Sequence, residues 1–165
     1  MKIYTVQKLN FLDNCDDNGF IINETDKSNS IFDSDRTIKA LKYIINYYKN
    51  RNGISSLDRE VIWFYDEFKY AYQAYQWMDN GYGLFVFEVP AAIFKKEFLW
   101  SDYFDWHLLL NDIEGTDWES IFDPPKDKSV IRQGISAYVN KKWIKKIIKK
   151  NWINSVLLIF YLNLI

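Results

Sequence analysis

The 165-residue chain has only one cysteine and only one histidine. Because disulfide frameworks and thiolate zinc sites need several sulfurs, Cys15 alone excludes both. His107 alone excludes zinc sites that need two or more histidines. A chain without disulfides suits a reducing compartment, so we expect a cytoplasmic protein.

The sequence also lacks the short motifs that mark the commonest nucleotide-binding and hydrolase sites. It contains no Gly-x-Gly-x-x-Gly, no P-loop and no Gly-x-Ser-x-Gly. The opening residues, MKIYTVQ, include no apolar run, and we therefore expect no signal peptide.

The chain has enough apolar and aromatic residues to bury a core. Hydrophobic residues make up 48% of it, aromatic residues 19% and charged residues 26%, which is unlike the composition of disordered segments. Its length falls within the ~100–200 residues usual for one domain. We expect a single α+β domain over residues 1–165.

Runs of β-branched and aromatic residues predict strands, and apolar residues three and four apart predict helices. The clearest helix begins near Asp35 and ends near Asn50, just before Asn52-Gly53. We expect a curved sheet, mixed or antiparallel, with three or four helices around it. The expected strands are 2–7, 20–22, 61–65, 84–89 and 129–135, and the other expected helical segments are 9–15, 66–78 and 91–97.

The sequence from Asn140 onwards is strongly basic. At ~100° per residue, the segment KKWIKKIIKK gathers Trp143 and its isoleucines on one side and its lysines on the other, which predicts an amphipathic helix. Residues 1–123 carry 12 basic and 21 acidic residues, a net charge of −9, whereas 124–165 carry 9 and 1, a net charge of +8. The basic end can lie against the acidic body or meet an anionic partner. The sequence pI of about 5.9 argues against a dedicated nucleic-acid-binding protein.

The last segment, 152–165, is almost wholly apolar. It has fourteen residues, including two Asn, against the ~20 apolar residues of a membrane-spanning helix, so we expect no spanning segment. Three interpretations stay open: a further core element, an anchor at a membrane surface formed with the lysine segment, or a dimer interface.

Several candidate chemical groups lie between Glu88 and His107. With Asp102 and Asp105 nearby, His107 can serve as a general acid or base, or can bond a backbone carbonyl and hold the local chain. The carboxylates of Glu88, Asp102 and Asp105 could do acid–base work or bind Mg²⁺ if they met in space, but nothing in the sequence brings them together, and we expect no metal. Ser101-Asp102 is equally suited to cap a helix.

Aromatic residues at strand positions offer a second kind of candidate. Trp63, Tyr65 and Trp106 could clamp a nicotinamide or a base, because flat rings stack on one another. Aromatic residues in strands also commonly fill the core, and this alternative stays open.

Several segments resemble a bacterial family known as domain of unknown function 3841. The most specific part is Glu88-Val89-Pro90 followed by LWSDYFDWHLLLN at 99–111. The resemblance implies a bacterial protein and names no reaction, and the richness of the chain in Ile, Asn, Lys and Tyr indicates an AT-rich bacterial or phage genome. The supporting segments are MKIYTVQ at the start, IWFY at 62–65, YQWM at 75–78 and IRQGISAYVNKKWI at 131–144, so that the resemblance covers most of residues 1–147.

The two ends of the chain are also similar to small ADP-ribosyltransferases: an Ile-Tyr-Thr strand, a helix, a glycine and a short strand at the start, and a strand then a helix with Trp-Ile at the end. In that superfamily the first strand and a late strand flank an NAD cleft, and a glutamate on the late strand stabilises the ribose cation. The resemblance places Gln133 there. Glutamine keeps hydrogen bonds to ribose but lacks the charge, so it implies binding with weakened or absent transfer unless Glu88 or Asp102 takes the role.

We therefore expect an ADP-ribosyltransferase-like module that binds NAD or a related nucleotide. The alternative is a non-catalytic interaction module that forms a homodimer or binds a protein partner through its C-terminal helix and apolar tail. No nucleic-acid partner is expected. The expected catalytic residues are Gln133, Glu88 and His107, and the expected cofactor-binding residues are Tyr4, Thr5, Gln7, Trp63, Tyr65, Asp102 and Trp106.

Overall fold

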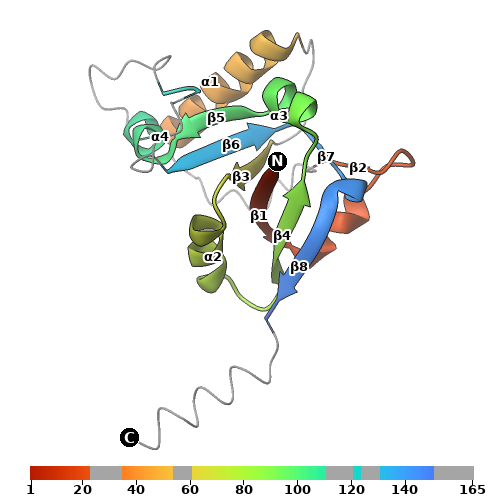
Figure 1. Ribbon diagram of the computed structural model, residues 1–165. Coiled ribbons are helices and arrows are strands. Elements are labelled where there is room, and N and C mark those ends of the chain that lie inside the picture. Colours follow the sequence, from red (N-terminus) through yellow and green to blue (C-terminus); the bar gives the residue numbers. More distant parts are fainter. Residues whose placement is uncertain (23–34, 54–60, 111–120, 124–130, 151–165) are drawn as a thin grey trace, which may run out of the picture.

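The computed structural model describes residues 1–22, 35–53, 61–110, 121–123 and 131–150. These residues form an α+β fold with a six-stranded sheet, a two-stranded sheet, four α-helices and two 3₁₀-helices (Figure 1). All described strand pairs are antiparallel, which confirms the expected fold class. In spatial order the large sheet consists of β5 (Leu99–Asp102), β6 (Arg132–Ser136), β3 (Ile62–Tyr65), β1 (Lys2–Lys8), β4 (Tyr82–Glu88) and β8 (Ile144–Lys149).

The strands β1 and β4 form the middle of the sheet. They pair along their whole length, from Lys2 opposite Glu88 to Lys8 opposite Tyr82. The sequence of β4, YGLFVFE, is apolar at almost every position because both of its faces are covered. Both strands were expected from the sequence, and β4 begins two residues earlier than the predicted segment 84–89.

One face of the large sheet, called the main-core face here, carries the largest apolar cluster. It is covered by η1 (Leu9–Asn14), α3 (Ala91–Glu97) and the small sheet of β2 (Phe20–Ile21) and β7 (Val139–Asn140). Aromatic rings dominate this cluster, and Phe64 meets Phe87 and Phe98 edge to face, as the ring quadrupoles favour. From the large sheet it includes Ile3, Ile62, Phe64, Phe85, Phe87 and Trp100.

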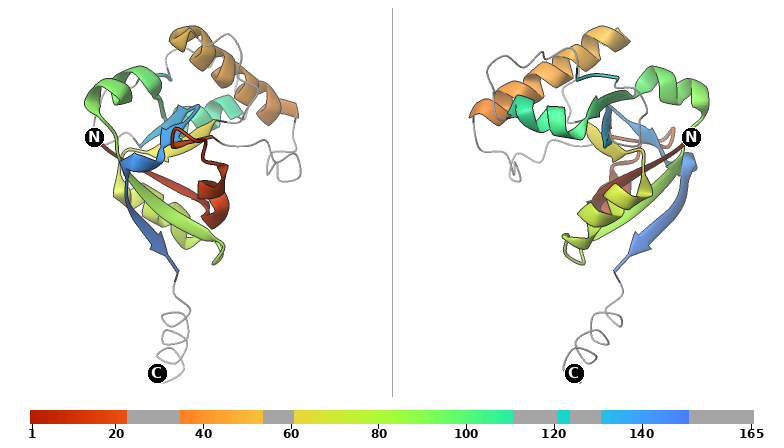
Figure 2. Two further views of the ribbon diagram at one scale, coloured as in Figure 1. Left: turned by 90° about the vertical axis from the view of Figure 1, so that its right-hand side faces the viewer. Right: turned by 60° about the vertical axis from the view of Figure 1, so that its left-hand side comes forward.

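The opposite face, called the helical face here, carries three α-helices in two separate clusters. Helices α1 (Asp35–Asn52) and α4 (Tyr103–Leu110) pack over β5 and β6, with Trp106 in the middle. Helix α2 (Phe68–Gln76) packs over β1 and β4 through Ala71. Figure 2 shows the two groups of helices from other sides.

The helix predicted near 35–50 is present as α1, and Tyr48 ties it to the rest of the fold. The buried Tyr48 hydroxyl donates to the backbone oxygen of Glu97 at 2.9 Å and accepts from the backbone N–H of Ala137 at 3.2 Å. One side chain thus joins α1 to the end of α3 and to the turn after β6. Such buried bonds are costly to leave unmade.

The prediction of an amphipathic helix from Asn140 onwards is wrong. After the 3₁₀-turn η2 (Lys141–Trp143), the chain forms the strand β8. Ile147 lies opposite Phe85 and Ile144 lies opposite Phe87, so two isoleucines three residues apart share one face. A register shift at Val86/Phe87 makes this possible, because a β-bulge adds one residue to one strand. The resulting spacing imitates the helical period.

The segment after α3 contains the candidate helix cap Ser101-Asp102. It forms β5 and then α4, and the Asp102 carboxylate caps the helix by accepting from the backbone N–H of Phe104 at 2.7 Å and of Asp105 at 3.3 Å. The outer edge of β5 is covered by residues 121–123, through bonds from Asp102 N to Ile121 O and from Asp123 N to Trp100 O.

None of the helices within the described ranges is long and apolar enough to cross a membrane. The apolar segment 152–165 lies outside the described residues, so its three interpretations stay open. The described chain ends at Lys150, whose ammonium group donates to the backbone oxygens of Gln76 and Met78 at the end of α2.

Candidate functional site

A row of side chains crosses the helical face of the sheet at right angles to the strands. Tyr4 on β1 lies opposite Tyr65 on β3, and Tyr65 lies opposite Gln133 on β6. Residues that lie directly opposite in antiparallel strands project to the same face. The expected cleft between the Tyr4 strand and the Gln133 strand is therefore wrong, because β3 lies between these strands and pairs with both.

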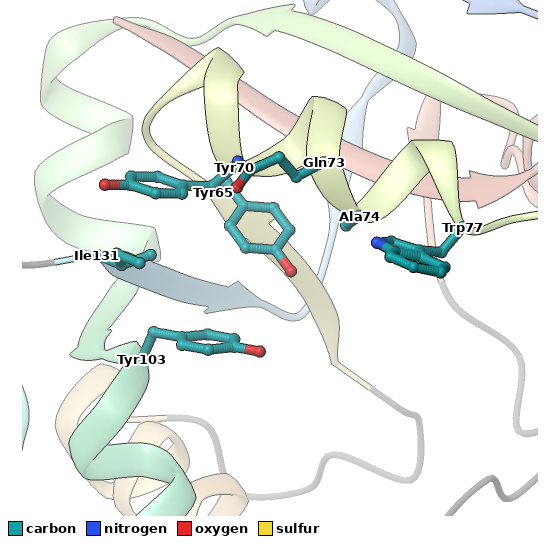
Figure 3. Close-up of a pocket in the computed structure, with 7 residues that line it drawn as sticks. All are labelled: Tyr65, Tyr70, Gln73, Ala74, Trp77, Tyr103 and Ile131. Atoms are coloured by element: carbon teal, nitrogen blue, oxygen red, sulfur yellow. The ribbon is translucent and has the colours of Figure 1, made fainter.

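A groove lies on the helical face, between α2 and the start of α4 (Figure 3). Its volume is about 230 Å³. One side is formed by α2 and the segment just after it, and Tyr103 forms the other side. The lining residues are Tyr65, Tyr70, Gln73, Ala74, Trp77, Tyr103 and Ile131.

Aromatic rings dominate the groove. Figure 3 shows Tyr103 projecting from α4 on one side and Trp77 from the end of α2 on the other. Trp77 is 90% exposed, so a large apolar surface borders the groove without being buried by the protein itself.

The phenol of Tyr65 stays uncharged over a wide pH range. Burial, and then the nearby Tyr103, raise the pKa of Tyr65 above its ordinary value. Its hydroxyl therefore remains a hydrogen-bond donor at neutral pH. The lining includes no lysine, arginine, aspartate or glutamate, so this groove offers rings, phenols and one amide rather than charge.

Gln133 lies beside this groove, next to Tyr65. It is two residues from Ile131, which lines the groove, and residues two apart in an extended segment project to the same side. Gln133 is half-buried, and its neighbour across the strand pair on β5 is Ser101, whose hydroxyl donates to the Gln133 backbone oxygen at 3.0 Å.

The expected aromatic clamp of Trp63, Tyr65 and Trp106 is divided by the structure. The rings of Trp63 and Trp106 contact each other at 5.2 Å between centroids, inside the cluster beneath α1. Trp106 is buried. These two tryptophans therefore fill the core, and Tyr65 alone of the three lines the groove.

The expected ligand-binding residues of the first strand lie on both faces of the sheet. Thr5 and Gln7 share the main-core face with Ile3, away from the groove. The Thr5 hydroxyl donates to the backbone oxygen of Trp63 at 2.6 Å and accepts from the Gln7 amide at 3.2 Å, which is a structural role. Tyr4 does face the helices, where it meets Phe68 edge to face.

The expected catalytic and carboxylate residues are not brought together. Glu88 lies on β4, three strand positions from the strand of Gln133, a separation of roughly 14 Å across the sheet. The Glu88 carboxylate pairs with the Lys145 ammonium group at 3.3 Å. The Asp102 carboxylate is engaged as the cap of α4. Burial, and to a smaller extent the nearby charge of Asp102, raises the pKa of Asp105. The backbone of His107 belongs to α4, but its side chain lies outside the described residues.

No group of three or more His, Cys, Asp or Glu side chains gathers as a metal site in the part of the chain that the structure describes. The positive charge nearest Gln133 in sequence, Arg132, is engaged elsewhere. It pairs with Asp66 at 3.3 Å, with side-chain exposures of 13% and 6%, and its guanidinium lies 5.1 Å from the centre of the Trp100 ring.

Sequence analysis missed most of the groove. Only a helical segment at 66–78 was predicted there, and the stripe of α2 that packs on the sheet includes Ala71 and Tyr75. The groove uses a second stripe of the same helix, Tyr70, Gln73, Ala74 and Trp77, at spacings i, i+3, i+4 and i+7. Two of these four residues are aromatic, and that pattern was available in the sequence.

No protein-family model, curated protein or solved structure matches this chain. The resemblances to domain of unknown function 3841 and to small ADP-ribosyltransferases therefore stay predictions, and the function has to be argued from the groove itself.

Proposed function

We propose that the protein binds NAD or a related nucleotide, with one flat ring of the ligand held in the groove between α2 and α4. The observation that carries this proposal is the lining of the groove by four aromatic side chains with Gln133 beside it. Stacking of a base on an aromatic ring contributes ~1–3 kcal/mol and needs no charged residue.

The size of the groove limits what it can hold. Pockets that enclose a whole drug-sized ligand have volumes of ~300–1,000 Å³. At about 230 Å³ this groove is smaller, so it suits one ring system. The ribose and phosphates of a nucleotide would lie outside it, in solvent or against the neighbouring surface.

The chemistry beside the groove favours binding over transfer. The Gln133 amide can donate to and accept from ribose hydroxyls, but it cannot supply the negative charge that stabilises a developing ribose cation. Glu88 lies too far away to replace it, since it lies on β4, three strand positions from β6, and pairs there with Lys145. We therefore propose an ADP-ribosyltransferase-like binding module in which transfer is weak or absent.

A thermal-shift series with NAD, ADP-ribose, AMP, ATP and NADP tests this proposal. A ligand present at 100 times its dissociation constant stabilises the folded state by ~2.7 kcal/mol, which raises the melting temperature by about 5–10 °C at this chain length. Trp77→Ala and Gln133→Ala should reduce the shift.

Tyr72→Ala is the matched control, because Tyr72 is an exposed aromatic residue of the same helix that does not line the groove. A series in which no nucleotide shifts the wild-type protein would contradict the proposal. Equal nucleotide affinity of the wild type and both groove variants would show that the site is elsewhere.

A second candidate function, the interaction module, is favoured by one observation. The lysine segment is an edge strand of the sheet, and Lys145, Lys146 and Lys149 are exposed on it. A partner would therefore meet a strand rather than the expected helix. Removal of 152–165 followed by light scattering tests whether the tail contributes: a folded product of lower mass would support a tail interface, and a product of unchanged mass would contradict it.

A further inference from the structure

The strand β8 lies at one edge of the large sheet, with β4 on its inner side (Figures 1 and 2). On its outer side no backbone partner is found among the residues that the structure describes. The opposite edge differs, because β5 is covered by residues 121–123. An uncovered edge strand presents a row of backbone donors and acceptors to which another extended chain can add.

The charge of this edge is of one sign. Residues 131–150 contain no aspartate or glutamate. Within β8, Lys145 is compensated by Glu88 at 3.3 Å, and Lys150 just beyond it is engaged by carbonyl oxygens at the end of α2. The exposed ammonium groups of Lys146 and Lys149 have no acidic partner among the described residues.

The four residues after the bulge form a symmetrical pattern, Lys146-Ile147-Ile148-Lys149. Ile147 belongs to the cluster on the main-core face and Ile148 to the cluster of α2 on the helical face, and both are only half-buried. Each apolar cluster is therefore left partly open at this edge, on its own side of the strand. An added strand with two apolar residues in the middle would cover both.

We propose that β8 binds an extended acidic segment of a partner protein, which adds to the sheet as a seventh strand with the pattern acidic–apolar–apolar–acidic. In such a strand the acidic side chains lie opposite Lys146 and Lys149, and the apolar pair lies opposite Ile147 and Ile148. Opposite charges across a strand pair each contribute ~0.2–1 kcal/mol. The pattern reads the same in both directions, so it fits a parallel or an antiparallel addition.

The charges also disfavour the pairing of β8 with β8 of a second copy of this chain. Pairing β8 with itself would place lysines against lysines, and like charges directly opposite are unfavourable. This inference specifies the partner and the surface of the second candidate function, and it is independent of the nucleotide groove. Loss of nucleotide binding and loss of peptide binding are thus separate results.

The test uses the full chain and three synthetic peptides of sequence TEVVET, TKVVKT and TEVPET. Backbone ¹⁵N–¹H spectra are recorded with each peptide at up to about 1 mM, the concentration that corresponds to a binding free energy near −4 kcal/mol. We expect TEVVET to shift the amides of β8 and to bind about tenfold more tightly than TKVVKT. TEVPET should bind as weakly as TKVVKT, because proline removes a donor and breaks the added strand.

A charge exchange provides the decisive comparison. The double variant Lys146→Glu, Lys149→Glu should lose TEVVET and gain TKVVKT. Lys141→Glu, Lys142→Glu, which changes two exposed lysines outside the strand, is the matched control and should keep the wild-type preference.

Three results would overturn the proposal. No shift with TEVVET would mean that the lysines only protect the edge. Equal binding of TEVVET and TEVPET would mean attraction between charges without an added strand. Tighter binding of a single-stranded oligonucleotide, with shifts at the same amides, would assign the surface to a nucleic acid instead.

Discussion

Replacing Gly134 with alanine should destabilise the protein through a single steric contact. A Cβ atom at this position would lie 2.7, 2.8 and 2.9 Å from three carbons of the Trp100 ring. The ring has little room to move, because it is buried and packs against Phe94 at 5.2 Å and Arg132 at 5.1 Å. Overpacking of this kind costs ~1–3 kcal/mol.

The change also has a favourable part, since alanine is better than glycine in a strand by ~0.5–1 kcal/mol. We therefore expect Gly134→Ala to lower the free energy of unfolding by about 1 kcal/mol, and by ~2.5 kcal/mol at most, measured by urea denaturation. In a double-mutant cycle, Trp100→Phe should remove most of that cost, because the smaller ring makes room. A stabilising Gly134→Ala, or strict additivity with Trp100→Phe, would refute the pairing of β5 with β6.

Three further changes test the packing and the charges. Tyr48→Phe leaves the buried backbone N–H of Ala137 without its acceptor and the Glu97 backbone oxygen without its hydroxyl donor, and should cost ~1–3 kcal/mol in denaturant unfolding. Burial, and then the nearby Glu97 and Tyr48, raise the pKa of Tyr138 from 10.0 to about 12. The stability that the neutral Tyr138 phenol contributes is therefore complete below pH 10 and should fall as the pH rises from 10 to about 12. Tyr138→Phe should remove this part of the pH dependence of the free energy of unfolding. Asp66→Ala and Arg132→Met should each cost ~3–5 kcal/mol in thermal or urea unfolding, because each leaves the other, largely buried charge without this ion pair.

The local elements of this fold were largely available from the sequence. The helix at 35–52, the strand IWFY and the apolar strand that Pro90 follows are set by short-range periodicity and by residues that begin or end an element. Strand order was not available in the same way, because it depends on contacts between segments far apart in the chain. That is why β3 was not expected between β1 and β6.

The error at β8 has a physical origin that the sequence conceals. The spacing of Ile144 and Ile147 fits a helical stripe, and it also fits a strand that contains one bulged residue. The edge of β4 favours the strand over the helix. Pairing with β8 satisfies the backbone N–H and C=O groups of β4 and helps to cover Phe85 and Phe87.

The candidate site was predicted in part. Tyr65 lines the groove and Gln133 lies beside it, whereas Trp63, Trp106, Thr5 and Glu88 are engaged in packing, hydrogen bonds or an ion pair. Sequence alone could not separate these groups, since an aromatic residue in a strand reads the same in a core and in a groove. Whether such a residue lines the groove or the core depends on where α2 and α4 lie on the sheet.

The central claim is that a ring of the ligand lies among the four aromatic side chains of the groove. Saturation-transfer NMR with NAD tests it most directly, because the protons closest to the protein receive the most saturation. We predict strong transfer to the protons of one ring system, weaker transfer to the ribose, and loss of the ring signal in Trp77→Ala but not in Tyr72→Ala. Even saturation over the whole molecule, or ring signals unchanged in Trp77→Ala, would contradict the claim.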